Sequence, residues 1–422
     1  MPARHLPSDE PFFAEWRERT PSSHRSLTRA AAIGHVLGAL PQTVPVLTVV
    51  GSKGKGTAAL HAAATLSAYL RPDGGFLRVG LVTSPSLRTN RERIRLDGRA
   101  IDEAALDDLA ARLASARAAV PVAGEDYLSP TGAYTVAGVA WLTAVGADVI
   151  VLEEGLGGAS DEVSLFTPDV VALSDVFAEH ADLLGGTLPA VARDLLGVVA
   201  PGRTDLVTGA QHPAVEEAIT ACSPACRRPP DEAGSAVPKT LAPLTRRNAV
   251  LGETAARTLA ARHGWSFDEP AARAALATVR LPGRASRHVT PQGAHVMVDG
   301  AISLSGVRTA AEEYAHWTGA SDRAVACFPD DKDVMACYAA LSAFAEVSAT
   351  RVGTHLRFAA TQRLHANVLN VEDALRSAVA AGGCLAVGTQ SFVGVVLDVL
   401  DVPTDDAYDA PKLSAPPPRA RR

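Results

Sequence analysis

The sequence has few cysteines and few aromatic residues, and no long apolar run. Its 422 residues include five cysteines, an odd and scattered set in which only Cys222 and Cys226 lie close together, without a histidine at ligand spacing. This pattern argues against a disulfide framework and a structural zinc site. No apolar run reaches the roughly 20 residues of a membrane-spanning helix, and the polar first ten residues do not resemble a signal peptide. We therefore expect a cytoplasmic protein with no membrane partner.

An excess of basic charge is also missing. The chain has 40 basic and 46 acidic residues, a net charge of -6, and only 5% aromatic residues. Nucleic-acid binding depends on a basic surface, so this composition predicts small-molecule partners and no nucleic acid. With 47% hydrophobic residues the chain is long enough for two or three domains with their own cores, and we expect a monomer.

Apolar, β-branched runs alternate with longer Ala- and Leu-rich stretches. This rhythm predicts an α/β fold of βαβ units around a mainly parallel sheet. The expected strands of the first half cover residues 46–50, 79–83, 149–152, 170–174 and 205–208. A Pro- and Ala-rich connection at 223–243 and a helix at 247–262 follow.

A domain boundary is expected at the LPGR segment, residues 281–284. A second α/β rhythm then begins, with strands expected at 295–298, 324–328 and 385–387. We predict an N-terminal domain over 1–284, a smaller C-terminal domain over 285–402, and a disordered tail over 403–422, which is rich in proline near its end.

The strongest local signal is the segment VVGSKGKGT at residues 49–57, an expected strand followed by a glycine-rich turn and a helix. Glycines let the backbone approach phosphate, the amides at the helix start favour an anion, and Lys55 can reach the β/γ-phosphates. Thr57 is placed to meet Mg²⁺ or phosphate. An ordinary turn with a solvated lysine is the less favoured interpretation. The predicted phosphate-binding residues are Gly51, Ser52, Lys53, Gly54, Lys55, Gly56 and Thr57.

A further glycine, Gly56, separates Lys55 from the hydroxyl residue and distinguishes this loop from the usual P-loop. The pattern G-[ST]-[NK]-G-K-G-[ST] resembles the ATP loop of the Mur ligases, and especially that of the folylpolyglutamate synthases. The resemblance implies ATP and Mg²⁺ as cofactors. It also implies a P-loop ATP-binding domain with a mainly parallel sheet, followed by a smaller Rossmann-like α/β domain.

Three further segments follow in the order of that family and imply the metal ligands. TSPSL at 83–87, with ERIR at 92–95, is similar to the family's TSPHL and ERI and implies Ser84 as a Mg²⁺ ligand, with Ser86 in place of a histidine. VLEEGLGG at 151–158 resembles VLEVGLGG and implies Glu153 as a magnesium-binding acid, whereas Glu154 has no counterpart. EHADLLGGT at 179–187 resembles DHxxxLGxT and implies His180 as a ligand of a second Mg²⁺.

The loop after Ser84 is rich in arginine. These arginines either hold an anionic substrate or are simply solvated, and the sequence leaves both interpretations open. They are Arg88, Arg91, Arg93 and Arg95.

The clearest departure from the family is Leu195. In the family a segment like IAxEKAGI carries a carbamylated lysine that supports the second metal, and Leu195 occupies the place of this lysine in VARDLLGV. A leucine cannot carry a carbamate. Either Asp194, Asp182 or Glu154 substitutes, or the second metal is held weakly or is absent.

The remaining matches concern ATP and the amine donor. Asn248 matches an asparagine that contacts ATP in the family's HQxxNA, although Thr245 replaces the glutamine. Arg284 matches the PGR of the domain junction and can pair with phosphate. Asp299 begins a segment like DGAHN, whose last two residues are changed to Ile302 and Ser303. Lys332, in a match to DKD, is predicted to orient an acidic amine donor.

These parts predict an ATP-dependent, ADP-forming ligase that activates a carboxylate as an acyl phosphate and joins it to an amino acid, with glutamate one option, or to another amine. The predicted catalytic residues are Lys55, Glu153, His180 and Lys332, and the predicted metal ligands are Thr57, Ser84, Glu153 and His180. The changed polar positions favour a specialised ligase over a genuine folylpolyglutamate synthase that adds glutamate to folate. Two further hypotheses are a nucleotide-binding protein that has lost ligation and acts with a partner, and a plain phosphotransferase.

Overall fold

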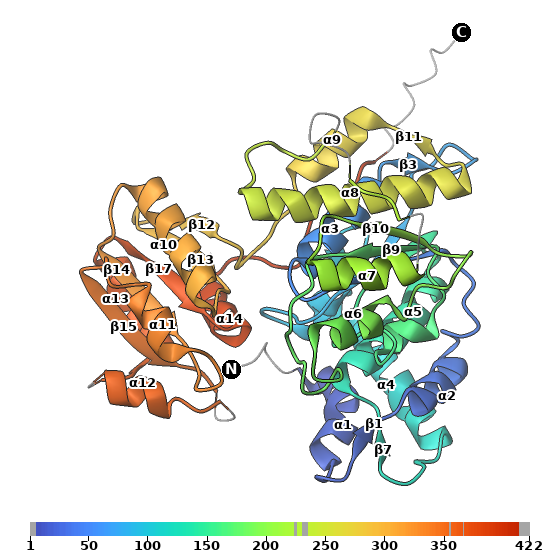
Figure 1. Ribbon diagram of the computed structural model, residues 1–422, viewed down its shortest axis with the longest axis horizontal. Helices are drawn as coiled ribbons and strands as arrows, with labels where there is room; N and C mark the ends of the chain where they lie inside the picture. The colour runs from blue at the N-terminus through green and yellow to red at the C-terminus, as the bar shows by residue number, and fades with distance from the viewer. Residues whose placement is uncertain (1–5, 223–225, 230–234, 354–355, 366, 413–422) are drawn as a thin grey trace. The chain divides into compact units, whose positions relative to one another are not determined.

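The computed structural model describes residues 6–222, 226–229, 235–353, 356–365 and 367–412, and these form two compact units (Figure 1). The larger unit contains Pro7–Pro85, Arg91–Arg280 and the described residues from Asp405 on. The smaller unit contains Leu281–Thr404 together with Leu6 and Ser86–Asn90.

A seven-stranded sheet forms the centre of the larger unit, in the order β10-β9-β2-β8-β4-β5-β6. The first five strands in this order are mutually parallel, and β5 and β6 extend the sheet in antiparallel pairing. The strands of this sheet are β2 (Val46–Val50), β4 (Val79–Val82), β5 (Ile94–Leu96), β6 (Arg99–Ala100), β8 (Val149–Glu153), β9 (Val170–Leu173) and β10 (Asp205–Thr208). Two short pairs lie outside it, β1 (His24–Arg25) with β7 (Asp126–Tyr127) and β3 (Tyr69–Leu70) with β11 (Ser266–Phe267).

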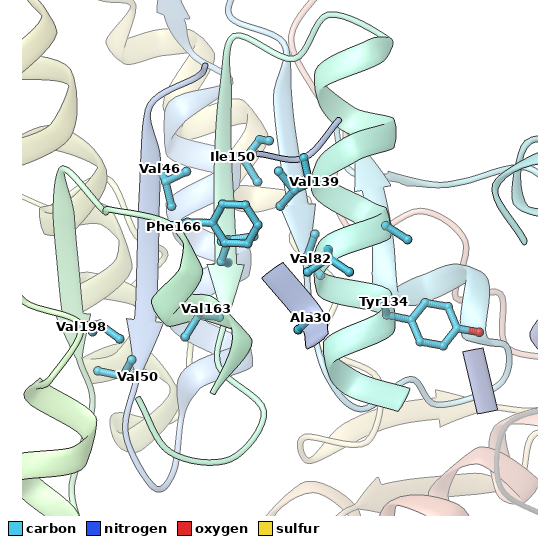
Figure 2. Packing of buried hydrophobic residues seen from close by; sticks show 14 of the residues in the cluster. Ala30, Val46, Val50, Val82, Tyr134, Val139, Ile150, Val163, Phe166 and Val198 are labelled. Carbon is cyan, nitrogen blue, oxygen red and sulfur yellow. The ribbon is translucent and has the colours of Figure 1, made fainter. Parts of the chain in front are cut away.

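Helices cover both faces of this sheet, because successive residues of its fully buried strands point to opposite sides. Val46 and Val50 of β2 belong to one core cluster, and Leu47 and Val49 belong to the other. Figure 2 shows part of the first cluster, in which Val82 of β4 and Ile150 of β8 lie near Val139 of α5, and Val46 of β2 lies near Phe166.

The helices of the first face are α1 (Glu10–Glu18), α2 (Leu27–Leu37), α4 (Glu103–Ala119), α5 (Pro130–Ala144), α6 (Leu188–Leu196) and α7 (Pro213–Cys222). Those of the opposite face are α3 (Lys55–Leu66), α8 (Pro243–His263) and α9 (Glu269–Ala277). Short 3-10 helices lie at Pro7–Asp9, Asn90–Arg93 and Glu162–Leu165.

The strand register places three loops at one edge of the sheet. Val49 of β2 pairs with Glu153 of β8, and Val50 pairs with Leu173 of β9. The three strands are parallel and end at the same level, so the loops that follow them lie side by side. Ligands of open α/β sheets bind at this carboxyl edge.

The smaller unit has a six-stranded sheet in the order β12-β13-β17-β14-β15-β16, with only β12 antiparallel to its neighbour. Its two faces are also covered by helices, α10 and α11 on one and α13 and α14 on the other. The strands are β12 (Ser286–Val289), β13 (His295–Asp299), β14 (Arg323–Cys327), β15 (Glu346–Arg351), β16 (Leu369–Asn370) and β17 (Gly383–Gly388). The helices are α10 (Leu304–Thr318), α11 (Val334–Ala339), α12 (Ala359–Leu364), α13 (Val371–Ala380) and α14 (Gln390–Val399).

Every strand expected from the sequence is present to within two residues at each end, and the α/β fold class is confirmed. The helix expected at 247–262 is α8, which begins earlier, at Pro243. Part of the connection expected at 223–243 lies outside the described residues. The remaining strands are not predictable in this way, because they lack the apolar run that marks a buried strand; they are β1, β3, β5, β6, β7, β11, β12, β15 and β16.

The expected disordered tail over 403–422 is wrong for residues 403–412. Ala407 and Tyr408 are buried in the core cluster that also contains α3 and α8. The Ala407 amide donates to the Gly98 carbonyl (2.8 Å), and the Arg280 amide donates to the Ala407 carbonyl (2.8 Å). The burial of Ala407 and Tyr408 and the backbone hydrogen bonds of Ala407 thus order this part of the segment. Residues 413–422 lie outside the described part of the chain.

The compact units divide at Leu281, the first residue of the LPGR segment, whereas the sequence predicts the boundary after Arg284. Across the described residues, the helices are all too short or too polar to span a lipid bilayer.

Candidate nucleotide site

A pocket lies at the carboxyl edge of the large sheet, entirely within the larger unit. The loops after β2, β8 and β9 contribute its walls, and α6 closes one side. Its lining residues are Gly51, Ser52, Lys55, Glu154, Gly155, Leu156, Gly157, Glu179, His180, Leu184, Val191 and Leu195.

The phosphate loop depends on two glycines. Gly51 and Gly54 have φ values of 136° and 90°, a region that L side chains rarely adopt. A Cβ atom at Gly51 would overlap Ser174 at the end of β9, and one at Gly54 would overlap the amide of Asn248 on α8. Gly54 caps α3, so the free amides of the first helical turn lie directly after the loop.

Lys55 is held at the floor of this pocket. Its Nζ donates to the Gly51 carbonyl (2.6 Å) and forms an ion pair with Glu154 Oε1 (2.9 Å). Burial would lower the pKa of the Lys55 ammonium, but the carboxylates of Glu154 and Glu153 together outweigh burial and raise this pKa above its usual value. Lys55 therefore carries a positive charge beside the loop, as binding of phosphate requires.

Glu154 is a buried acid whose side chain is 2% exposed. Burial raises its pKa to about 7, against the opposing effect of Lys55. Only Oε1 faces Lys55. The second oxygen, Oε2, is buried and has no hydrogen-bond partner within the described part of the chain.

Glu153 and Ser84 lie together beside the loop. The Glu153 carboxylate accepts from the Ser84 amide (Oε2 to N, 3.1 Å), and a Cβ at Gly56 would lie 3.4 Å from Glu153 Oε1. The Ser84 hydroxyl accepts from Arg93 (3.1 Å). Thr57 is buried in the first turn of α3. The residues predicted to bind the first metal thus come from neighbouring elements around one turn.

His180 lines the pocket from the loop after β9, where it is exposed and has a positive φ of 51°. The neighbouring Glu179 also lines the pocket and pairs with Lys53 of the phosphate loop (3.2 Å). Glu179 is a site residue that the sequence-based prediction misses. Its place in the motif before His180 is the signal that could have found it.

Leu195 lies on the buried, apolar face of α6 and is 2% exposed. Its neighbour Asp194 points to the glycine-rich loop after β8, where its carboxylate accepts from the Gly158 amide (2.7 Å) and the Ser160 hydroxyl (3.0 Å). The helix thus presents a methyl-bearing side chain to the pocket at the position where the family pattern has a lysine.

The side chains of the pocket would need oxygen atoms from a bound ligand to complete the coordination of a magnesium ion. Within the ranges that the structure describes, no three His, Cys, Asp or Glu side chains converge to form a complete metal site. Mg²⁺ commonly binds through one or two carboxylates, with waters and substrate phosphates completing its shell. Glu153, beside Ser84 and the phosphate loop, fits this mode.

Three predicted residues belong to the smaller unit. Asp299 ends β13, and its carboxylate accepts from the amides of Ala285 and Ala301 (2.7 Å each). Burial raises the Asp299 pKa, which these amides partly offset. Arg284 lies close to Gly300, and Lys332 pairs with its neighbour Asp331 (2.9 Å). These three residues keep their predicted roles as hypotheses.

The loop arginines are neither free for a substrate nor simply solvated. Arg91 donates to the Ile101 carbonyl (2.7 Å), and Arg93 lies over the Tyr134 ring, 5.1 Å from its centroid. Arg88 pairs with Asp398 (2.6 Å) in the smaller unit, and Arg95 donates to the Asp405 carbonyl in the larger. Their sequence spacing gives no sign of these internal partners.

Comparison with known proteins finds folylpolyglutamate synthases among the relatives of the chain, although no protein-family model matches it. The folylpolyglutamate synthase of Lacticaseibacillus casei is 34% identical over 189 residues, which cover 43% of the chain and 41% of that enzyme. The dihydrofolate synthase/folylpolyglutamate synthase of Mycobacterium tuberculosis is 29% identical over 208 residues, 46% of the chain and 42% of that enzyme. The matched segment thus spans less than half the length of these curated relatives.

Solved structures extend the similarity to most of the chain. The apo form of the L. casei enzyme superposes with a TM-score of 0.75 and 23% identity, over 94% of this chain and all of that one. The Yersinia pestis bifunctional folylpolyglutamate synthase/dihydrofolate synthase, solved with AMPPNP and a Mn ion, gives 0.76 and 23% over 95% of this chain. At this identity the superposition establishes the fold. The chain therefore has the fold of the folylpolyglutamate synthases, and its relatives in sequence and structure are the folylpolyglutamate and dihydrofolate synthases of the Mur ligase superfamily.

Proposed function

We propose that this protein is an ATP-dependent ligase that joins a carboxylate to an amine and forms ADP. One observation carries the proposal: the partly buried ammonium of Lys55 faces a pocket that is also lined by the phosphate-loop glycine Gly51 and by His180. Binding of a metal-bound triphosphate requires a positive charge, free helix amides and acidic residues, and this edge of the sheet offers all three.

In the proposed reaction the loop amides and Lys55 hold the β- and γ-phosphates. A carboxylate oxygen of the substrate attacks the γ-phosphorus, the bond to the β,γ-bridging oxygen breaks, and ADP leaves. The resulting acyl phosphate is attacked at its carbonyl carbon by an amine, which loses a proton as phosphate departs. When bound at Glu153, Ser84 and Thr57, Mg²⁺ supplies charge neutralisation for the phosphoryl oxygens.

The relatives support this class of reaction and suggest its substrates. They are named folylpolyglutamate and dihydrofolate synthases, and solved relatives are described with AMPPCP and folate or with AMPPNP and Mn. A genuine folylpolyglutamate synthase, which adds glutamate to folate, is the second candidate. A specialised ligase is favoured over this candidate by the changes at polar positions of the family's site, which are Leu195, Ser86, Thr245, Ile302 and Ser303.

The test is chromatography of the nucleotide products, with ATP, Mg²⁺ and a panel of carboxylates and amines that includes folate with glutamate. We expect ADP and phosphate, released only when both a carboxylate and an amine are present. AMP and pyrophosphate would overturn the acyl-phosphate mechanism. ATP binding without turnover on the whole panel would favour the rival function, a nucleotide-binding protein that has lost ligation.

A further inference from the structure

Two departures from the family pattern meet in one pocket. Leu195 stands where the family has a carbamylated lysine, and Glu154 stands where the family has a valine in VLEVGLGG. The two residues are far apart in the sequence, yet both line the pocket at the phosphate loop, one from α6 and one from the loop after β8. Compared with the family pattern, the pocket therefore loses the carbamate on α6 and gains a carboxylate directly after β8.

The other acids near α6 are committed elsewhere. The Asp194 carboxylate is used by the Gly158 amide and the Ser160 hydroxyl. Asp182 is exposed and is absent from the pocket lining as far as the described residues show. Glu179 does line the pocket, but it is paired with Lys53.

Glu154 differs from these acids because part of its carboxylate is unused. Oε1 forms the ion pair with Lys55, whereas the buried Oε2 has no hydrogen-bond partner among the residues that the structure describes. A buried carboxylate oxygen without a donor is unfavourable. A divalent cation beside it would remove this cost, and a carboxylate is the ligand type that Mg²⁺ prefers.

We infer that Glu154 provides the carboxylate for the second divalent cation of the site, in place of the carbamylated lysine, with His180 on the opposite loop as its companion. The inference rests on the proposed function, since the cation binds together with nucleotide phosphates. It explains why an acid follows Glu153 in a chain whose α6 carries a leucine at the pocket.

The test counts cations directly and does not depend on turnover. Free Mn²⁺ is titrated by electron paramagnetic resonance with the full chain and the non-hydrolysable analogue AMPPCP. We expect two Mn²⁺ per chain for the wild type and one for Glu154→Gln, or a second site at least about tenfold weaker. Asp182→Asn, a change of an exposed acid that is not among the lining residues given above, should keep both. Two sites of unchanged affinity in Glu154→Gln, or a single site in the wild type, would overturn the inference.

A paired exchange tests whether the two positions serve the same cation. Glu154→Val combined with Leu195→Lys restores the family pattern, so its second Mn²⁺ should return only when bicarbonate is added, because a lysine carbamate forms from CO₂. A folded double variant that does not regain the site, or regains it without bicarbonate, would contradict the inference. Calorimetry with AMPPCP separates the two proposals: absence of binding to the wild type would remove both, whereas binding with one Mn²⁺ would remove only this one.

Discussion

The amide of Asn248 on α8 occupies the space into which a Cβ atom at Gly54 would project. Gly54 also has a positive φ of 90°. Gly54→Ala should therefore displace the start of α3 and weaken AMPPCP binding by at least about tenfold, as calorimetry would measure. Gly74→Ala is the matched control, because Gly74 has a similar φ of 86° but open space around its Cα. It should cost about 1 kcal/mol of stability and leave nucleotide affinity unchanged. Equal affinities for both variants would show that the contact with Asn248 does not shape the loop.

Lys55→Ala should abolish turnover and weaken AMPPCP binding by at least about tenfold. The variant removes the partly buried positive charge that would lie beside the phosphates and leaves Glu154 without its ion pair. Lys53→Ala, which alters a half-exposed lysine of the same loop, should have a smaller effect. Intact activity and affinity in Lys55→Ala would refute the assignment of this loop.

Glu153→Gln should reduce Mg²⁺-dependent activity more than Glu154→Gln does. Glu153 lies beside Ser84 and the start of α3, and a neutral amide is a poor ligand for a hard cation. Initial rates over a Mg²⁺ titration provide the measurement. A reversed order would mean that the register of the β8 end has been misassigned.

Leu195→Ala should destabilise the protein by about 2–5 kcal/mol, since the side chain is 2% exposed within a core cluster. Urea unfolding would measure the change.

The reaction rate of the wild type should not change when bicarbonate is added to CO₂-depleted buffer, because a leucine cannot be carbamylated. Clear stimulation by bicarbonate would show that some lysine does carry a carbamate and that residues 191–198 are wrongly aligned with the family.

His61 gives a prediction about pH. Burial on α3 lowers its pKa to about 4, so the folded protein keeps this ring neutral while the unfolded chain takes up a proton near pH 6.5. The unfolded state binds more protons between these values, and stability should therefore fall as pH drops from about 6.5 to 4, by roughly 1.4 kcal/mol per pH unit from this group. Denaturant unfolding at several pH values would show a shallower decline for His61→Gln, in which the amide can still donate to the Thr57 carbonyl. Parallel declines for the two proteins would exclude His61 as the cause.

Much of this site could be predicted because its chemistry is local in sequence. The phosphate loop from Gly51 to Thr57 combines strand, glycines and helix in one segment, and the ends of β8 and β9 follow apolar runs that are easily seen. The ion pair between Lys55 and Glu154 could not be predicted, because it depends on the register of β2 with β8. The hydrogen bond from the Gly158 amide to Asp194 could not be predicted either, since no sequence pattern in α6 indicates a contact with a distant loop.

Residues 405–412 return to the larger unit after the chain has completed the smaller one. Tyr408 fills a place in the core beside α3 and α8, and the backbone of Ala407 joins Gly98 to Arg280. The smaller unit is in this sense an insertion within the larger. During synthesis, therefore, the larger unit cannot complete its core when residue 280 leaves the ribosome, and must wait until the whole smaller unit and Tyr408 have emerged. Helix α3, which directly follows the phosphate loop near the beginning of the chain, thus packs in a core that is complete only when Tyr408 has been made.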